Sequence, residues 1–135
     1  MRQAADSSIT IAALVADHEA HELAEDALKQ CTTTIAHVAI ETYSVLTRLP
    51  PPRRLLSADA AALIDARLPS KQATLDADKH AEAPTRLAAA GISGGATYDG
   101  LIALTALEHD LELITRDKRA ERTYRALAVP YRLLP

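Results

Sequence analysis

The feature that most constrains the fold is an alternation between short β-rich segments and longer segments rich in alanine and leucine. This alternation is typical of an α/β fold. Successive candidate strands are far enough apart in the chain to be joined by helical crossovers, which connect parallel strands. The sequence therefore predicts a mostly parallel sheet with helices on both faces. The expected strands are residues 2–5, 32–36, 72–75, 111–115 and 129–134.

The intervals between these strands carry helix signals. Asp6, Ser7 and Ser8 are good N-cap residues, and helical sequence follows them to about Lys29. A run of three prolines at 50–52 ends a further helix. The remaining expected helices are residues 38–48, 57–66, 78–90, 94–109 and 118–127.

Length and composition favour one domain over residues 1–135. The single cysteine, Cys31, excludes an internal disulfide and a multi-cysteine zinc site, and it fits a reducing cytoplasm. No apolar run approaches the roughly 20 residues of a membrane helix. The N-terminus also lacks a charged and apolar leader. We therefore expect a cytoplasmic protein that does not enter a membrane.

The charge balance argues against a protein that coats nucleic acid. The net charge is -3, with 18 acidic and 15 basic residues, whereas non-specific nucleic-acid binders are strongly basic. An enzyme that touches only a few phosphates remains compatible with this balance. The chain also has no Phe or Trp, so a base-stacking platform is poorly supplied.

Four acidic residues depart from the local pattern. Asp99 shares a helical stripe with Ile102 and Ala106, and Glu41 shares one with Val38. A carboxylate on an apolar face is unfavourable unless it is paired. Two others, Asp6 and Asp117, each follow an expected strand, where ligands gather in open α/β sheets.

Carboxylates that converge at one edge repel each other, and a divalent cation removes that repulsion. Ligation by oxygen alone favours Mg²⁺ or Mn²⁺ over zinc or copper. Such an ion can lower the pKa of a bound water and stabilise the charge that develops in phosphodiester cleavage. Ser8 and Thr115 stand two residues from Asp6 and Asp117, so strand alternation would let their hydroxyls orient a carboxylate or water.

Simpler roles are open for each acid. Asp6 and Asp117 could be helix caps. Glu41 and Asp99 could be first-turn charges that interact with the helix dipole. Pattern alone does not favour a four-acid metal site over these roles.

Four motifs in order resemble a PIN domain, and in detail the VapC toxins of bacterial toxin–antitoxin pairs. They are DSS at 6–8, AIE at 39–41, GGATYDGLIA at 94–103 and LITRDKRA at 113–120. The last two motifs, at this spacing, are the specific ones. The resemblance implies a three-layer α/β/α sandwich and a Mg²⁺- or Mn²⁺-dependent endoribonuclease. It also implies the site residues: Asp6, Glu41, Asp99 and Asp117 match the acidic positions, and Ser8 and Thr115 the supporting polar positions.

The resemblance further implies structured cellular RNA, transfer or ribosomal, as the target. It implies a small VapB-like antitoxin as partner, and a homodimer or a toxin–antitoxin hetero-oligomer as the assembly. Family members usually begin with a strongly apolar strand, whereas this chain begins Met1-Arg2-Gln3-Ala4-Ala5. The alternative is a catalytically silent PIN-like module that binds RNA or a protein partner, against which the intact acids argue.

Basic residues surround the last acid of the set. We hypothesise that Arg116, Lys118 and Arg119 hold the RNA backbone, because arginine forks and helix N-termini both suit phosphate. The alternative is a solvated face interleaved with Glu121.

Overall fold

The structure is a computed structural model that describes residues 1–135, and its strands are all parallel. All five predicted strands are present, each shorter than expected. Pairing joins β1 to β4, β4 to β5 and β2 to β3. The N–H of Thr32 donates to the carbonyl of Gln3 at 3.0 Å, which places β2 beside β1 and gives the order β3-β2-β1-β4-β5. The strands are β1 (Gln3–Ala5), β2 (Thr34–Ile35), β3 (Gln72–Ala73), β4 (Glu112–Thr115) and β5 (Tyr131–Leu133).

The helices occupy the predicted intervals, with one correction. The predicted helix that runs to about Lys29 is two helices, because Val15 adopts an extended conformation and the His18 ring accepts the N–H of Ala20 at 3.0 Å. Pro84 lies inside a helix that continues past it. The α-helices are α1 (Ser7–Leu14), α2 (His21–Gln30), α3 (Ala36–Leu46), α4 (Ser57–Arg67), α5 (Ala77–Ala89), α6 (Thr97–Glu108) and α7 (Glu121–Ala126). Short 3-10 turns, η1 (Gly94–Ala96) and η2 (Lys118–Ala120), precede the last two.

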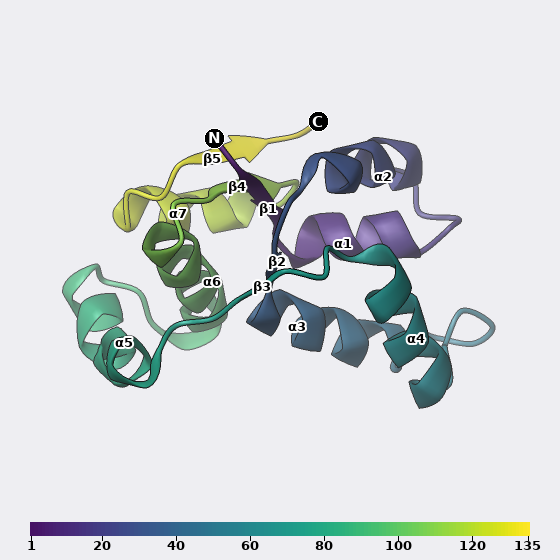
Figure 1. The fold of residues 1–135 in the computed structure, drawn as a ribbon, viewed down its shortest axis with the longest axis horizontal. Coiled ribbons are helices and arrows are strands. Elements are labelled where there is room, and N and C mark those ends of the chain that lie inside the picture. The colour runs from purple at the N-terminus through teal and green to yellow at the C-terminus, as the bar shows by residue number, and fades with distance from the viewer.

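Helices cover both faces of the sheet, which confirms the predicted three-layer α/β/α arrangement. Figure 1 shows α1 and α2 on one side of the strands and α6 and α7 on the other. Along β4, Ile114 packs in the cluster of α1 and α2, whereas Leu113 packs in the cluster of α6 and α7. The helix α5 lies outside α6, and Leu87 and Leu104 belong to a third core cluster between them. None of the helices combines the length and apolar character needed to span a bilayer.

The weakly apolar first strand is nonetheless central in the sheet. Ala4 is 0% exposed and Ala5 is 5% exposed, and they face opposite helical layers. Their small side chains suit a strand with a helix packed closely on each side. Pairing with β4, reinforced by a 2.8 Å bond from Gln3 Nε2 to Glu112 Oε1, outweighs the poor strand propensity of alanine.

The connections create a switch point at β1. The chain leaves β1 to form β2 on one side, and later returns to form β4 on the other side. At such a point the loops that follow neighbouring strands diverge and leave a crevice at the carboxyl ends of the strands. Asp6 follows β1 directly, and Asp117 lies two residues after β4. The fold therefore positions both residues at one edge of the sheet.

Candidate functional site

Asp6 is buried at the end of β1, and hydrogen bonds hold both its backbone and its side chain. Its backbone N–H donates to the Ile114 carbonyl at 3.0 Å, which fixes it beside β4. Its side chain caps α1: Oδ1 accepts the N–H of Ser8 at 3.0 Å and the Ser8 hydroxyl at 2.5 Å. The other oxygen, Oδ2, accepts the hydroxyl of Tyr124 at 2.7 Å. Asp6 is thus a helix cap, and its carboxylate also reaches the edge of the sheet.

Ser8 and Thr115 connect the ends of β1 and β4. Besides its bond to Asp6, the Ser8 hydroxyl accepts the N–H of Arg116 at 2.8 Å and lies 3.3 Å from the Thr115 hydroxyl. The Thr115 hydroxyl in turn accepts the N–H of Asp117 at 3.0 Å. The Ser8 hydroxyl therefore contacts the Asp6 carboxylate, whereas the Thr115 hydroxyl, on β4, contacts the backbone of Asp117; strand alternation is the wrong explanation for Ser8 alone. Ser8 lies in α1 rather than on a strand, and capping geometry brings it to Asp6.

The other two acids project from helices toward the same edge. Asp99 stands in the first turn of α6, as expected. The expectation that Glu41 is a first-turn charge is wrong, because α3 begins at Ala36 and has no acid in its first turn. Thr42, next to Glu41, shares a 2.7 Å hydroxyl contact with Thr10 and so holds α3 against α1.

The fourth acid, Asp117, follows β4 and caps η2 by accepting the N–H of Arg119 at 2.9 Å.

Electrostatics ties the four acids into one cluster, which we call the acid cluster: Asp6, Glu41, Asp99 and Asp117. Burial and then the charges of Asp6, Asp117 and Glu41 raise the pKa of Asp99 to about 6. The pKa of Glu41 is raised by burial and by the charge of Asp6, an effect that the nearby Ser7 hydroxyl partly offsets. Burial also raises the pKa of Asp6, against the opposing hydrogen bonds of Ser8, Thr115 and Tyr124. The charges of the other three acids therefore oppose the ionisation of Asp99, and the charge of Asp6 opposes that of Glu41.

One pair of polar atoms beside the acid cluster has no hydrogen-bond partner. Glu41 Oε1 and His37 Nε2 are both buried, and they lie 3.8 Å apart. Burial, followed by the charge of His80, lowers the pKa of His37, so the ring is neutral at pH 7. An unpaired buried carboxylate oxygen is costly, and a cation is its natural partner.

The acid cluster fits a hard divalent cation by its chemistry. All of its donors are carboxylate oxygens, which suit Mg²⁺ and Mn²⁺. No group of three His, Cys, Asp or Glu side chains stands in a ligating arrangement, so these carboxylates would have to rotate to share one cation.

Tyr124 is a site residue that sequence reasoning missed. It is 0% exposed and donates its hydroxyl to Asp6. Nothing in the basic segment around it signals this role, because α7 spans only Glu121–Ala126 and shows no clear apolar periodicity. The presence of a tyrosine in this short helix is the only feature of the sequence that points to a buried contact.

We expect Tyr124→Phe to destabilise the protein by about 1.5–3 kcal/mol, because a buried carboxylate oxygen loses a hydrogen bond. Urea unfolding at pH 7.5 measures the change. Tyr131→Phe is the matched control, because Tyr131 packs against Tyr124 but its hydroxyl does not reach Asp6. Equal stability of Tyr124→Phe and the parent protein would contradict the role assigned to this bond.

The basic residues lie beside Asp117 and face solvent to different degrees. Arg116, Asp117, Lys118 and Arg119 line an open hollow of about 610 Å³ together with residues 133–135. Arg116 donates from Nε to the carbonyl of Pro135 at 2.9 Å. Lys118 and Arg119 are exposed and form no ion pair. Two free cationic side chains therefore flank the acid cluster.

Comparisons with known proteins agree with this architecture. The PIN domain family matches residues 4–126. Ribonuclease VapC40 of Mycobacterium tuberculosis is 42% identical over 131 residues, which cover 97% of this chain and 98% of that protein. Ribonuclease VapC27 of the same organism is 43% identical over 128 residues, with 93% and 92% covered.

Solved structures show the same fold at low identity. The crystal structure of VapBC2 from Rickettsia felis, bound to a DNA fragment from the promoter, has a TM-score of 0.68 and 16% identity, with all of both chains covered. FitAcB from Neisseria gonorrhoeae has a TM-score of 0.61 and 20% identity, with 95% of this chain and 94% of that chain covered.

Proposed function

This chain belongs to the PIN domain family, among the VapC ribonucleases, and from that premise we propose that it is a metal-dependent endoribonuclease. The proposed enzyme is one PIN-like domain over residues 1–135 that requires Mg²⁺ or Mn²⁺. The observation that carries the proposal is the gathering of four carboxylates at one edge of the sheet, where burial and then the charges of Asp6, Asp117 and Glu41 raise the pKa of Asp99. Carboxylates that oppose each other's ionisation gain most from a bound cation.

Each residue of the site has a distinct task in this proposal. The carboxylates of Asp6, Glu41, Asp99 and Asp117 would hold the cation, which when bound would lower the pKa of a water and offset charge on the phosphate. Ser8 holds the Asp6 carboxylate, and Thr115 holds the backbone at Asp117. The bond from Tyr124 restricts rotation of Asp6. Hydrogen-bond partners of this kind orient the residues that bind a metal.

We propose structured cellular RNA, transfer or ribosomal, as the substrate and a VapB-like antitoxin as the partner. The support is the identity with two VapC ribonucleases, together with the likeness to the VapBC2 structure. The proposed assembly is a homodimer or a toxin–antitoxin hetero-oligomer. Co-expression with the product of a small neighbouring reading frame should yield a complex that no longer cuts RNA, which size-exclusion chromatography and a cleavage assay together measure.

Metal removal tests the activity directly. Total RNA incubated with the purified chain and Mn²⁺ should be cut, and EDTA should abolish the cutting until Mn²⁺ is added in excess. Gel analysis of RNA fragments gives the readout, and heat-denatured protein serves as the blank. Cutting that persists in EDTA contradicts the metal site. A folded protein that binds RNA but never cuts it supports the catalytically silent alternative.

The proposed RNA contacts make a separate prediction. Arg116→Glu together with Lys118→Glu should weaken RNA binding and lower the slope of log affinity against log salt by about one for each lost phosphate contact. Filter binding from 50 to 300 mM salt gives this slope. Arg48→Glu is the control, because Arg48 is exposed just beyond the C-terminus of α3 and forms no ion pair. An unchanged slope in the double variant contradicts the assignment.

A further inference from the structure

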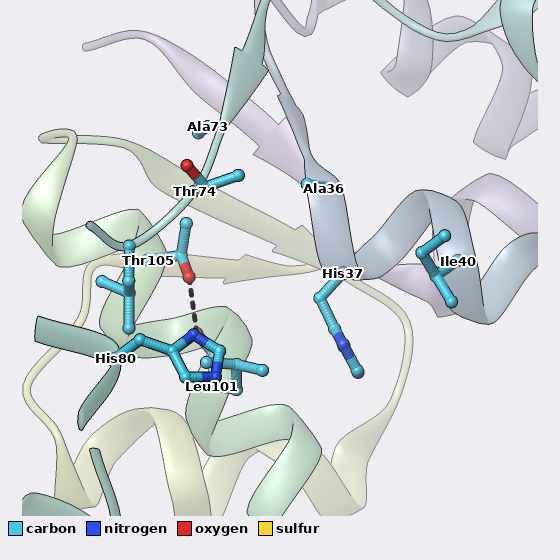
Figure 2. A pocket seen from close by; sticks show the side chains of 9 residues that line it. Ala36, His37, Ile40, Ala73, Thr74, His80, Leu101 and Thr105 are labelled. Carbon is cyan, nitrogen blue, oxygen red and sulfur yellow. Dashed lines mark hydrogen bonds between the residues drawn. The ribbon is translucent and has the colours of Figure 1, made fainter. Parts of the chain in front are cut away.

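A pocket of about 220 Å³ lies next to the acid cluster at the same edge of the sheet. Its walls come from the start of α3, the segment after β3, and helices α5 and α6. Figure 2 shows His37 and Ile40 on one side of this pocket, with His80 and Leu101 across from them. The volume is below the roughly 300–1,000 Å³ typical of sites for drug-sized ligands, so the pocket suits a single ring system.

The pocket has an aromatic wall despite the absence of Phe and Trp. His37 lines it, and Tyr98 stacks on His37 with ring centroids 5.5 Å apart and an angle of 6° between the planes. Tyr98 is 56% exposed, so the pair is open to solvent. Nucleobases stack on such rings regardless of sequence, because every base has a π face. The expectation from composition, that base stacking is poorly supplied, therefore misses this pair.

The pocket adjoins the acid cluster at His37 and Glu41. His37 follows β2 and Thr74 follows β3, just as Asp6 and Asp117 follow β1 and β4. His37 Nε2 lies 3.8 Å from Glu41 Oε1, so a pocket wall touches a member of the acid cluster. An RNA strand that crosses the carboxyl edge with one phosphate at the acid cluster would carry a neighbouring base to the pocket.

We propose that this pocket binds one unpaired base of the RNA substrate, stacked on the His37 ring that Tyr98 supports. This inference rests on the proposed function and adds a base subsite to it. His37 is here a substrate-binding residue, and Tyr98 is a positioning residue that acts through it. A base held in duplex cannot enter, so the pocket selects RNA that is unpaired at that nucleotide.

Binding experiments with uncleaved RNA test the subsite apart from catalysis. The protein carries Asp99→Asn so that the probe survives, and the probe is a fluorescein-labelled eight-nucleotide RNA in the presence of Mn²⁺. A series of probes places a single abasic site at each position in turn. Anisotropy titrations compare His37→Phe with His37→Leu, which differ mainly in aromaticity. Tyr43→Leu, on an exposed part of α3 that does not line the pocket, is the control.

The expected result is specific in position and in side chain. His37→Leu should weaken binding of the intact probe by roughly 5- to 150-fold, the loss typical of one stacked base, whereas His37→Phe and Tyr43→Leu should stay near the parent affinity. One abasic position should weaken binding by the parent protein and have no further effect in His37→Leu. Tyr98→Ala should give a smaller loss with the same position dependence.

Other outcomes separate the subsite from the activity. Equal affinities of His37→Leu and His37→Phe, at any level, overturn the stacking assignment, as does the absence of a position-specific abasic effect. A pocket that instead receives a protein side chain would leave every RNA affinity unchanged and would weaken only the complex with the antitoxin, which also overturns the proposal. Position-specific base binding in a protein that never cuts RNA counts against the proposed activity alone.

Discussion

Asp99→Asn should lower Mn²⁺-dependent RNA cleavage by more than about 100-fold while making the metal-free protein more stable. The loss of rate should exceed the 10- to 100-fold typical of outer-shell partners, because Asp99 is a proposed metal ligand. The gain in stability has a separate cause. At pH 7.5 the charge of Asp99 is opposed by burial and by three neighbouring acids, and the amide has no charge.

The sign of the stability change follows from linkage. The pKa of Asp99 rises from 3.8 to about 6 on folding, so the folded state binds the proton more tightly. Stability from this group is full below pH 3.8, is lost as the pH rises through about 6, and is absent at pH 7.5. Asp99→Asn should restore roughly 1 kcal/mol, after allowance for the solvent that screens this half-buried group, or about 4 °C in Tm.

Thermal melts in EDTA and cleavage assays in Mn²⁺ measure the two effects on the same samples. Asp65→Asn removes an exposed charge on α4 and should change neither. Because added Mn²⁺ stabilises a protein that binds it, Mn²⁺ should raise the Tm of the parent protein and have little effect on Asp99→Asn. Destabilisation of the variant in EDTA contradicts the charge repulsion, and cleavage equal to that of the parent contradicts the role of Asp99 as a metal ligand.

Acidification should reduce cleavage by at least about tenfold per pH unit below pH 6. Metal ligands must be ionised, so protons compete with the cation for the acid cluster. Asp99 has a pKa of about 6, and the pKa values of Asp6 and Glu41 are also raised, so more than one proton can compete. The fall in rate can therefore be steeper than first order in protons.

The concentration of metal provides an internal check on this explanation. Raising Mn²⁺ should shift the midpoint of the pH profile to lower pH, because metal and protons compete for the same oxygens. Initial rates from pH 5 to 8, at two Mn²⁺ concentrations, measure the shift, and circular dichroism confirms that the protein stays folded at pH 5. A midpoint that does not depend on Mn²⁺, or a flat profile, contradicts competition at the acid cluster.

The sequence predicts the layers of the fold well because the patterns that indicate them lie within short stretches of the chain. The alternation of segments is carried by neighbouring residues, and the apolar stripe that holds Asp99 and Ile102 reflects the packing of α6 on the sheet. The predicted strands are longer than the observed ones because residues that favour strands, such as Thr33 and Thr74, continue beyond the paired segments. The interruption between α1 and α2 could not be predicted because residues 15–20 contain neither Pro nor Gly. The turn is stabilised instead by the His18 ring, which accepts the N–H of Ala20.

The links that organise the site could not be predicted, because they join residues far apart in the chain. The Ser8 hydroxyl meets the backbone of Arg116, and the Tyr124 hydroxyl meets Asp6. Neither contact follows from spacing or from helical periodicity. The stack of His37 on Tyr98 could not be predicted either, because α3 and α6 must pack together before the two rings can meet.

The two alanines of β1 carry a consequence for how this protein can vary. Ala4 and Ala5 lie between helical layers that pack closely on both faces, so a larger side chain at either position would push a layer outward. Displacing α6 would move Asp99, and displacing α1 would move Ser8. In a saturation-mutagenesis map, these unreactive positions should therefore tolerate as few substitutions as the carboxylates do.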